Sequence, residues 1–307
     1  MDYSNAIDDE VRAFIDEGNK YYPENAVTRS IEQQRGFYDA MCHAFHRGYP
    51  AGVTAQDLTF DRVRCREYVS GASDVTVVYY HGGGFVVGGL ESHDDVCAEI
   101  CDQTGFRVVS VDYRLAPEHV HPAAFNDSWA AFAAIAERYS GPLILAGDSA
   151  GANLGAAVAH HARGRIDKRI VGQVLIYGAF GGDMTQGSYQ THAFAPQLTL
   201  EDVIYYLDVR SGGNESADDY TFAPLRDADF SGLPPTVLFS ADIDPLRDDS
   251  RDYRDAVLEA GGKAVWINEP GLLHGYLRAR VMSSKAAGSF SRITGAISAL
   301  GHGIWPF

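Results

Sequence analysis

The sequence predicts an α/β fold in which a mostly parallel sheet is covered by helices on both faces. After about residue 55, short runs rich in β-branched residues alternate with longer stretches of helical character. The runs are apolar on both faces, as the strands of a parallel sheet are when helices cover both of its sides. The 307 residues suffice for one large domain of this kind or for two smaller ones.

The expected elements follow one another in regular order. Strands are expected at 75–80, 107–111, 142–146, 171–177, 236–240 and 264–268. Helices are expected between them, at 92–104, 126–139, 152–163 and 248–260. Residues 58–69 (LTFDRVRCREYV) alternate more openly between apolar and polar side chains, which is typical of an antiparallel strand at the edge of a sheet.

Two segments lie outside this alternation. Residues 1–50 are expected to be helical and carry several aromatic side chains, and residues 181–232 form a long excursion between two strands, with a helix near 200–209. Long insertions at the carboxyl ends of strands usually serve a site. We therefore expect a helical cap over 1–50 and an α/β domain over 51–307, in which 181–232 contribute to a lid or to the pocket wall.

The charge balance excludes several kinds of partner. The chain holds 25 Lys and Arg against 41 Asp and Glu, a formal net charge of −16. Nucleic acids and anionic membrane surfaces require clustered cations, so neither is an expected partner. The hydrophobic fraction of 46% and the charged fraction of 21% are ordinary for a globular protein with a sizeable core.

The compartment is expected to be the cytoplasm. The stretch MDYSNAIDDEVRAFIDEG contains no basic segment followed by an apolar one, so it predicts no secretory signal. No apolar run approaches the ~20 residues that span a bilayer. The four cysteines show no metal-binding spacing, and Cys97 and Cys101, four apart on an expected helix, are interpreted as small buried side chains in a reduced protein.

A serine stands at the tightest point of the chain, in the stretch GDSAG. Ser149 lies between an apolar strand and a helix of small residues, with Gly147 and Gly151 two positions away on either side. Such a turn strains the backbone of its central residue, and larger side chains at the two glycine positions would collide. The hydroxyl is then held above the sheet at the start of a helix, whose dipole favours an anion there. This context favours a nucleophilic serine over a simple glycine turn.

A serine nucleophile needs a base, and the base needs a carboxylate that orients it. In folds of this kind the acid and then the histidine follow on later strands. His274, in the stretch WINEPGLLHGY, stands just after the last expected strand, and Asp244 follows the strand before it. Asp242 is an alternative acid that the periodicity does not exclude. The neighbouring histidines 160 and 161 are expected to be exposed on their helix.

Consecutive glycines follow the strand at 75–80, in the stretch YYHGGGFVVGG (79–89). Without side chains, their backbone N–H groups can approach a substrate oxygen and stabilise a developing negative charge. His81 is expected to hold this loop by hydrogen bonds rather than to act as the base. A phosphate-binding loop is the alternative, but neither nucleotide-binding glycine motif is present.

Together these motifs resemble the hormone-sensitive-lipase-like branch of the α/β-hydrolase family, the bacterial family IV esterases. The resemblance extends from about residue 75 to 276. Its motifs, in order, are HGGGF (81–85), DYRLAPEH (112–119), GDSAGAN (147–153), DFSGLPP (229–235), DPLRD (244–248) and HGY (274–276).

The resemblance implies the α/β-hydrolase fold and a serine carboxylesterase that acts on short- to medium-chain acyl esters, without cofactor or metal. It makes Ser149, His274 and Asp244 the catalytic triad, and so favours Asp244 over Asp242. It implies that the oxyanion hole is formed by the N–H groups of Gly83, Gly84 and Ala150, and that an N-terminal cap covers the acyl pocket. Some members form homodimers through the last strand, so a homodimer is allowed here.

Two positions depart from the family pattern. Gly178 follows Tyr177 where relatives commonly carry proline, and His121 stands where an aromatic residue is frequent. Neither belongs to the expected triad, although the first can reshape the pocket wall. Two other functions stay open at this point: cleavage of amides or formamides by the same residues, and ligand binding without catalysis. Plant gibberellin receptors, which resemble this family, have lost the catalytic histidine, whereas this sequence retains His274.

Overall fold

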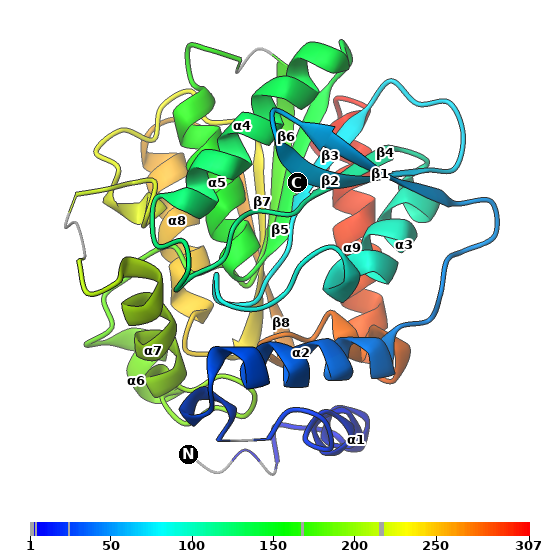
Figure 1. The fold of residues 1–307 in the computed structure, drawn as a ribbon. Coiled ribbons are helices and arrows are strands. Elements are labelled where there is room, and N and C mark those ends of the chain that lie inside the picture. The colour runs from blue at the N-terminus through cyan, green and yellow to red at the C-terminus, as the bar shows by residue number, and fades with distance from the viewer. Residues whose placement is uncertain (1–2, 4, 24, 167–168, 215–217) are drawn as a thin grey trace.

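An eight-stranded sheet runs through the middle of the molecule (Figure 1). The computed structural model describes residues 3, 5–23, 25–166, 169–214 and 218–307. The strand order is β1-β2-β4-β3-β5-β6-β7-β8. The strands are β1 (Thr54–Phe60), β2 (Val63–Val69), β3 (Thr76–Tyr80), β4 (Arg107–Val111), β5 (Leu143–Asp148), β6 (Ile170–Ile176), β7 (Thr236–Ile243) and β8 (Ala264–Leu273). From β4 to β8 every neighbouring pair is parallel, which confirms the mostly parallel sheet.

Helices cover both faces of the sheet, as the doubly apolar strands predict (Figure 1). On β3, Val77 and Tyr79 belong to one buried cluster, whereas Val78 and Tyr80 belong to another on the opposite face. The first cluster includes residues of α3 and α9, and the second includes residues of α4, α5 and α8. These helices are α3 (Asp94–Thr104), α4 (Ala123–Arg138), α5 (Ala150–Ala162), α8 (Arg247–Glu259) and α9 (Ser284–Gly301).

The prediction of one edge strand at 58–69 was wrong. This part of the chain forms two antiparallel strands, β1 and β2, and β2 pairs with β4. Asp61 and Arg62 form the turn between them, with φ angles of 41° and 69°. Two consecutive residues with positive φ are typical of a tight hairpin turn, which usually contains Asn or Gly. Because neither residue is present here, the alternation continued through the turn without a visible break.

Strands β7 and β8 extend farther than predicted. Their pairing continues to Ile243 and Leu273, which lie opposite each other at the carboxyl end. The next residue of each strand is Asp244 and His274, respectively. Parallel pairing therefore delivers these two side chains to the same end of the sheet, next to each other.

The two segments outside the alternation lie together at one end of the sheet. Residues 1–50 form α1 (Asp9–Gly18) and α2 (Ile31–Phe45), and residues 181–232 contain α6 (Gly187–Thr191) and α7 (Leu200–Ser211). Hydrogen bonds cross between them, from Gln34 Nε2 to Tyr205 Oη at 2.7 Å and between the hydroxyls of Tyr22 and Tyr206 at 3.1 Å. We refer to the two segments as the cover.

Cover helices begin at strong caps. The side chain of Ser30 accepts a hydrogen bond from the backbone N–H of Gln33, and the side chain of Gln33 accepts one from the backbone N–H of Ser30, so α2 starts with a capping box. Thr199 and Asp202 form the same arrangement at the start of α7. These caps satisfy N–H groups that a helix leaves without partners in its first turn.

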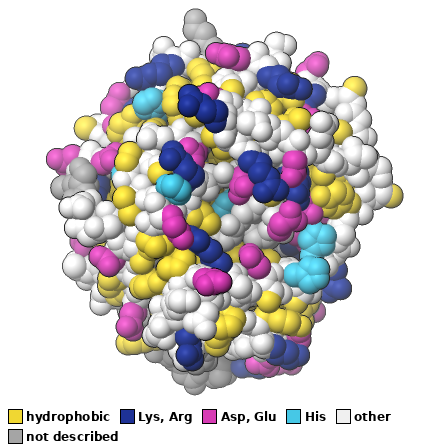
Figure 2. Space-filling model, in the orientation of Figure 1, with side chains coloured by type: hydrophobic (Ala, Val, Ile, Leu, Met, Phe, Trp, Pro, Cys, Tyr) yellow, Lys and Arg dark blue, Asp and Glu magenta, His cyan; other side chains and the backbone are white. Residues whose placement is uncertain are grey.

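Surface charges of both signs are interspersed. On the face in Figure 2, Asp and Glu side chains lie among Lys and Arg side chains rather than in one acidic patch. All four cysteines are free and buried, as expected for Cys97 and Cys101 on α3. Among the described helices, none combines the length and the apolar character that crossing a bilayer requires.

Candidate active site

Ser149 is the single residue between β5 and α5. Its φ of 53° and ψ of −118° are unusual for a residue with a side chain and mark a strained turn. A methyl group on Gly151 would lie 1.9 Å from the carbonyl oxygen of Tyr80, and one on Gly147 would lie 2.6 Å from that oxygen. Both glycines are therefore required by the close approach of β3 to the turn, and the hydroxyl of Ser149 is left facing a cavity.

His274 bridges Ser149 and Asp244. Its Nε2 lies 2.9 Å from the Ser149 oxygen, and its Nδ1 lies 2.7 Å from Oδ2 of Asp244. Asp244 is fully buried, and its other oxygen accepts a hydrogen bond from the N–H of Leu246 at 2.8 Å. A carboxylate at Nδ1 favours the tautomer that carries its proton there, so Nε2 is left as an acceptor facing the serine hydroxyl.

Asp242, the alternative acid, is engaged elsewhere. Its Oδ1 accepts a hydrogen bond from the Asn268 side chain at 2.8 Å, and its Oδ2 accepts one from the N–H of Gly271 at 3.2 Å. These contacts fasten the carboxylate to β8, away from the His274 ring. Positions two apart on a strand face the same side, which is why the sequence periodicity did not separate the two acids. Strand β7 ends at Ile243, between them, so Asp244 lies outside the strand.

Gly83, Gly84 and Ala150 line the same cavity as Ser149. The two glycines have φ angles of 124° and 60°. A methyl group on Gly83 would lie 2.2 Å from the Val87 carbonyl oxygen. Within the described chain, the N–H groups of Gly83 and Gly84 donate to no carbonyl, and that of Ala150 belongs to the unsatisfied first turn of α5. These N–H groups can therefore serve a bound oxygen.

His81 and Asp148 hold the glycine loop from beneath. The His81 ring stacks on Tyr113, and its Nδ1 lies 2.7 Å from the Gly82 carbonyl oxygen. Burial lowers the pKa of His81 to about 3, so its neutral ring donates this bond. Asp148 accepts from the N–H of Gly82 at 3.1 Å and from the Tyr79 hydroxyl at 2.8 Å.

Asp148 keeps its negative charge although it is buried. Burial opposes ionisation, but the neighbouring His93, whose Nε2 lies 3.2 Å away, and the charge of Arg278 outweigh it and hold the pKa of Asp148 well below its usual range. Sequence reasoning did not single out this residue, although it directly precedes Ser149. Its role as an anchor for the glycine loop depends on contacts between β5 and β3, which one sequence does not display.

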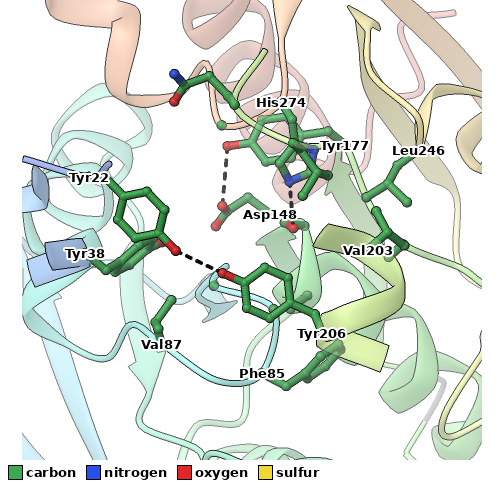
Figure 3. A pocket seen from close by; sticks show the side chains of 18 of the residues that line it. Tyr22, Tyr38, Phe85, Val87, Asp148, Tyr177, Val203, Tyr206, Leu246 and His274 are labelled. Atoms are coloured by element: carbon green, nitrogen blue, oxygen red, sulfur yellow. Dashed lines mark hydrogen bonds between the residues drawn. The ribbon is translucent and has the colours of Figure 1, made fainter. Parts of the chain in front are cut away.

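The cavity beside Ser149 has a volume of about 140 Å³ and is mostly apolar. Both segments of the cover contribute to its wall, with Phe14, Tyr22, Tyr38 and Met41 from the first and Gln197, Leu198, Val203, Tyr206 and Leu207 from the second. Figure 3 shows Tyr22 and Tyr206 meeting across the cavity. The cover therefore encloses the space that faces the serine.

The expectation that His160 and His161 are exposed was wrong. His160 is buried, with Nδ1 2.6 Å from Asp227 and Nε2 2.9 Å from the Tyr253 hydroxyl. His161 is half-buried and lies 2.9 Å from the Tyr220 hydroxyl. Neither lines the cavity. Among the described residues, no group of three or more His, Cys, Asp or Glu side chains is arranged to hold a metal ion.

The chain is similar to proteins of one large family. A family described by the alpha/beta hydrolase fold matches residues 77–278. The carboxylesterase NlhH of Mycobacterium tuberculosis is 37% identical over 236 residues, which cover 74% of this chain and 74% of that protein. The chain belongs to the α/β-hydrolase family, and relatives that it resembles within it are carboxylesterases. Its fold, its family and its class of enzyme, an ester hydrolase, are thereby confirmed.

Solved structures agree with this assignment. A hyperthermophilic esterase from the archaeon Pyrobaculum calidifontis superposes on the esterase described here with a TM-score of 0.87 at 29% identity, over 96% of this chain and 98% of the other. An esterase from the bacterial hormone-sensitive lipase family, at 24% identity and a TM-score of 0.87, shares the fold over 96% of this chain and 99% of its own.

In this esterase, Asp249 anchors the segment after β6 that departs from the family pattern. Its Oδ2 accepts hydrogen bonds from the N–H groups of Phe180 at 2.7 Å and Gly181 at 3.0 Å, and from the Tyr189 hydroxyl at 3.1 Å. Burial raises the pKa of Asp249 to about 7 despite these donors. The protonated acid is thus part of the folded state up to neutral pH.

This raised pKa predicts a pH-dependent stability. Between about pH 4 and pH 7 the folded state keeps a proton at Asp249 that the unfolded chain releases, so the free energy of unfolding that this group contributes falls as the pH rises. The Asp249→Asn variant lacks this dependence. Thermal unfolding from pH 4 to 8 should show the melting temperature of the wild type falling relative to that of the variant up to about pH 7. A relative rise would contradict the assignment.

Proposed function

We propose that this esterase hydrolyses short- to medium-chain acyl esters, with Ser149 as the nucleophile, His274 as the general base and Asp244 as its orienting acid. The observation that carries the proposal is the hydrogen-bonded path from the Ser149 hydroxyl through His274 to a buried carboxylate, at 2.9 Å and 2.7 Å. These are distances over which a proton can be transferred.

The proposed reaction follows from the hydrogen-bonded path that joins Ser149, His274 and Asp244. His274 Nε2 takes the Ser149 proton as the oxygen attacks the ester carbonyl carbon, and the carbonyl oxygen becomes negatively charged. The imidazolium then protonates the departing alcohol, which leaves an acyl group on Ser149. A water molecule, activated by the same nitrogen, releases the acid and restores the serine. Asp244 stabilises the imidazolium and keeps the ring oriented throughout.

Three backbone N–H groups are proposed to bind the negatively charged oxygen, those of Gly83, Gly84 and Ala150. These residues line the cavity beside Ser149, and no carbonyl of the described residues is a hydrogen-bond partner of their N–H groups. Preorganised donors of this kind act at full strength because they need no reorganisation during the reaction; loss of one costs about 100- to 1000-fold in rate. The N-terminus of α5 adds a favourable dipole at the same point.

We infer that the cover, formed by residues 1–50 and 181–232, sets the acyl-chain length. Its side chains enclose a cavity of about 140 Å³, which is small. In a series of p-nitrophenyl esters from acetate to palmitate, kcat/KM should be greatest at short chains, roughly C2 to C8. An optimum at palmitate would contradict a cavity of this size.

Amide cleavage by the same residues is separated from ester hydrolysis by a matched pair of substrates. An ester and an amide with the same acyl group differ only in the leaving group, so their kcat/KM values compare the two activities directly. The proposal expects the ester to be strongly preferred. A preference for the amide would replace it with an amidase.

A further inference from the structure

Arg278 is one of the residues that line the cavity beside Ser149. It belongs to the turn that follows His274, and its backbone N–H donates to the Gly275 carbonyl at 3.3 Å. A methyl group built on Gly275, another wall residue, would lie 3.9 Å from Nη1 of Arg278. Nη1 is therefore near the residue adjacent to the proposed base.

Two of the three guanidinium nitrogens are already used. Nε donates to Sγ of Cys42 at 3.3 Å, and Nη2 donates to the Tyr38 hydroxyl, both on α2. The guanidinium also lies 4.8 Å from the centre of the Tyr38 ring. Nη1 has no hydrogen-bond partner within the described part of the chain, and no carboxylate of that part lies within 4.0 Å of the group.

This lack of a carboxylate partner distinguishes Arg278 from the other deeply placed arginine of the same turn. Arg280, two residues later, pairs with Asp95 at 2.6 Å and with Glu99 at 2.8 Å. The acid of the cavity wall, Asp148, is occupied by His93, Tyr79 and the N–H of Gly82. Arginine stays charged, and the buried carboxylate of Asp148 offsets part of that charge through space. Asp148 makes no direct contact with the guanidinium, so the N–H groups on Nη1 still lack an acceptor among the described residues.

Tyr38 adds a second donor at this point. Its oxygen accepts the hydrogen bond from Arg278, and its own O–H has no acceptor among the described residues. Tyr38 also lines the cavity, where the other wall residues of α2 and α7 offer mainly apolar and aromatic surface. An O–H and an N–H that both lack acceptors form a corner suited to an anion, and a guanidinium binds a carboxylate especially well.

A purely structural role accounts for only part of this arrangement. The hydrogen bonds to Cys42 and Tyr38 connect α2 to the turn after β8. A neutral side chain of similar length, with fewer donors, could make the same connection. Neither contact uses Nη1. A structural role alone also gives no acceptor to Nη1 of a residue that lines the cavity beside Ser149.

We propose that Arg278 and Tyr38 bind a carboxylate on the substrate, so that the preferred esters carry a negative charge on their acyl or alcohol part. This inference rests on the proposed function and narrows its substrate class. The small cavity limits the chain between the ester and the carboxylate to a few carbons. Half-esters of short dicarboxylic acids are the simplest molecules of this class.

The test compares two substrates that differ only in charge. Monomethyl adipate carries a terminal carboxylate, and methyl adipamate carries a neutral amide of nearly the same shape. A second arm compares 4-acetoxybutanoate, which carries the charge on its alcohol part, with 4-acetoxybutanamide, in which a neutral amide replaces the carboxylate. For the wild type, kcat/KM should be at least about tenfold higher for the charged member in one arm, the effect of one charge-assisted hydrogen bond.

Variants assign that preference to Arg278. In Arg278→Gln, the ratio of kcat/KM for the charged ester to that for the neutral ester should fall to about one. In Arg278→Lys and in Tyr38→Phe, this ratio should lie between one and the wild-type value. Arg62→Gln removes the same charge from the exposed turn between β1 and β2 and should leave the ratio unchanged. Melting temperatures show whether each variant is folded; if Arg278→Gln is not, the Lys and Phe variants carry the test.

The outcomes separate this inference from the proposed function. A wild-type ratio near or below one in both arms would overturn the inference, as would a ratio that survives in Arg278→Gln. If the neutral esters are hydrolysed while the ratio is near one, ester hydrolysis stands and only the carboxylate site fails. If neither the neutral esters nor p-nitrophenyl butyrate is hydrolysed, the proposed function itself fails.

Discussion

Replacing Ser149 with alanine is expected to lower kcat for p-nitrophenyl butyrate by about 10⁴- to 10⁶-fold. The variant loses the oxygen that the proposed mechanism uses as the nucleophile, while the N–H groups of the cavity remain. The melting temperature should change little, because a methyl group fits where the hydroxyl faces open space beside the turn. Steady-state kinetics and a thermal melt measure the two effects.

The same variant tests for covalent catalysis. A fluorophosphonate probe should label the wild-type protein and fail to label Ser149→Ala, because such probes require an activated serine. Wild-type activity in Ser149→Ala would refute the proposed nucleophile. An absence of labelling in the folded wild type would instead favour a protein that binds its ligand without catalysis.

Replacing Asp244 with asparagine is expected to lower kcat by about 10⁴-fold. The amide can donate a hydrogen bond to Nδ1 of His274. This favours the tautomer that carries its proton on Nε2, the nitrogen that must accept the proton of Ser149. The matched control is Asp242→Asn, two residues earlier, whose carboxylate faces Asn268 and Gly271. It should retain most of the activity.

The comparison of these two variants decides which acid serves the base. If Asp242→Asn loses as much activity as Asp244→Asn, the orienting role is not confined to the carboxylate at 2.7 Å from His274. Rescue at higher pH separates a tautomer effect from misfolding, since hydroxide replaces the lost base only in a folded protein. Circular dichroism provides the corresponding check on structure.

Much of the architecture could be predicted because local pattern and global fold agree. Strands that are apolar on both faces fit only a parallel sheet between two layers of helices, and the doubly buried β3 shows this. The turn around Ser149 could be predicted because its glycines are required by backbone contact, which leaves a mark in the sequence itself. His274 could be proposed because parallel strands end at one edge, whereas strand placement left Asp242 and Asp244 open and the family resemblance favoured Asp244.

Other features depend on contacts that no local pattern encodes. The hairpin at Asp61 and Arg62 has a turn without the usual residues, so the strand alternation hid it. His160 was expected on a solvent-facing surface because its helix was considered alone; the loop carrying Asp227 covers it. Arg278 and Tyr38 are 240 residues apart, and only the folded chain brings them together.

The hydrogen bond between Tyr22 and Tyr206 ties together two stretches that surround the same space from opposite directions. One of them precedes residue 77, where the match to the family begins. Part of the selectivity that we propose for the cover is thus carried by residues that precede Ser149, Asp244 and His274 in the chain. Mutations at Phe14, Tyr22, Tyr38 and Met41 can diversify what this scaffold accepts while the bond-breaking apparatus stays untouched, which makes those four positions the natural starting library for redirecting it.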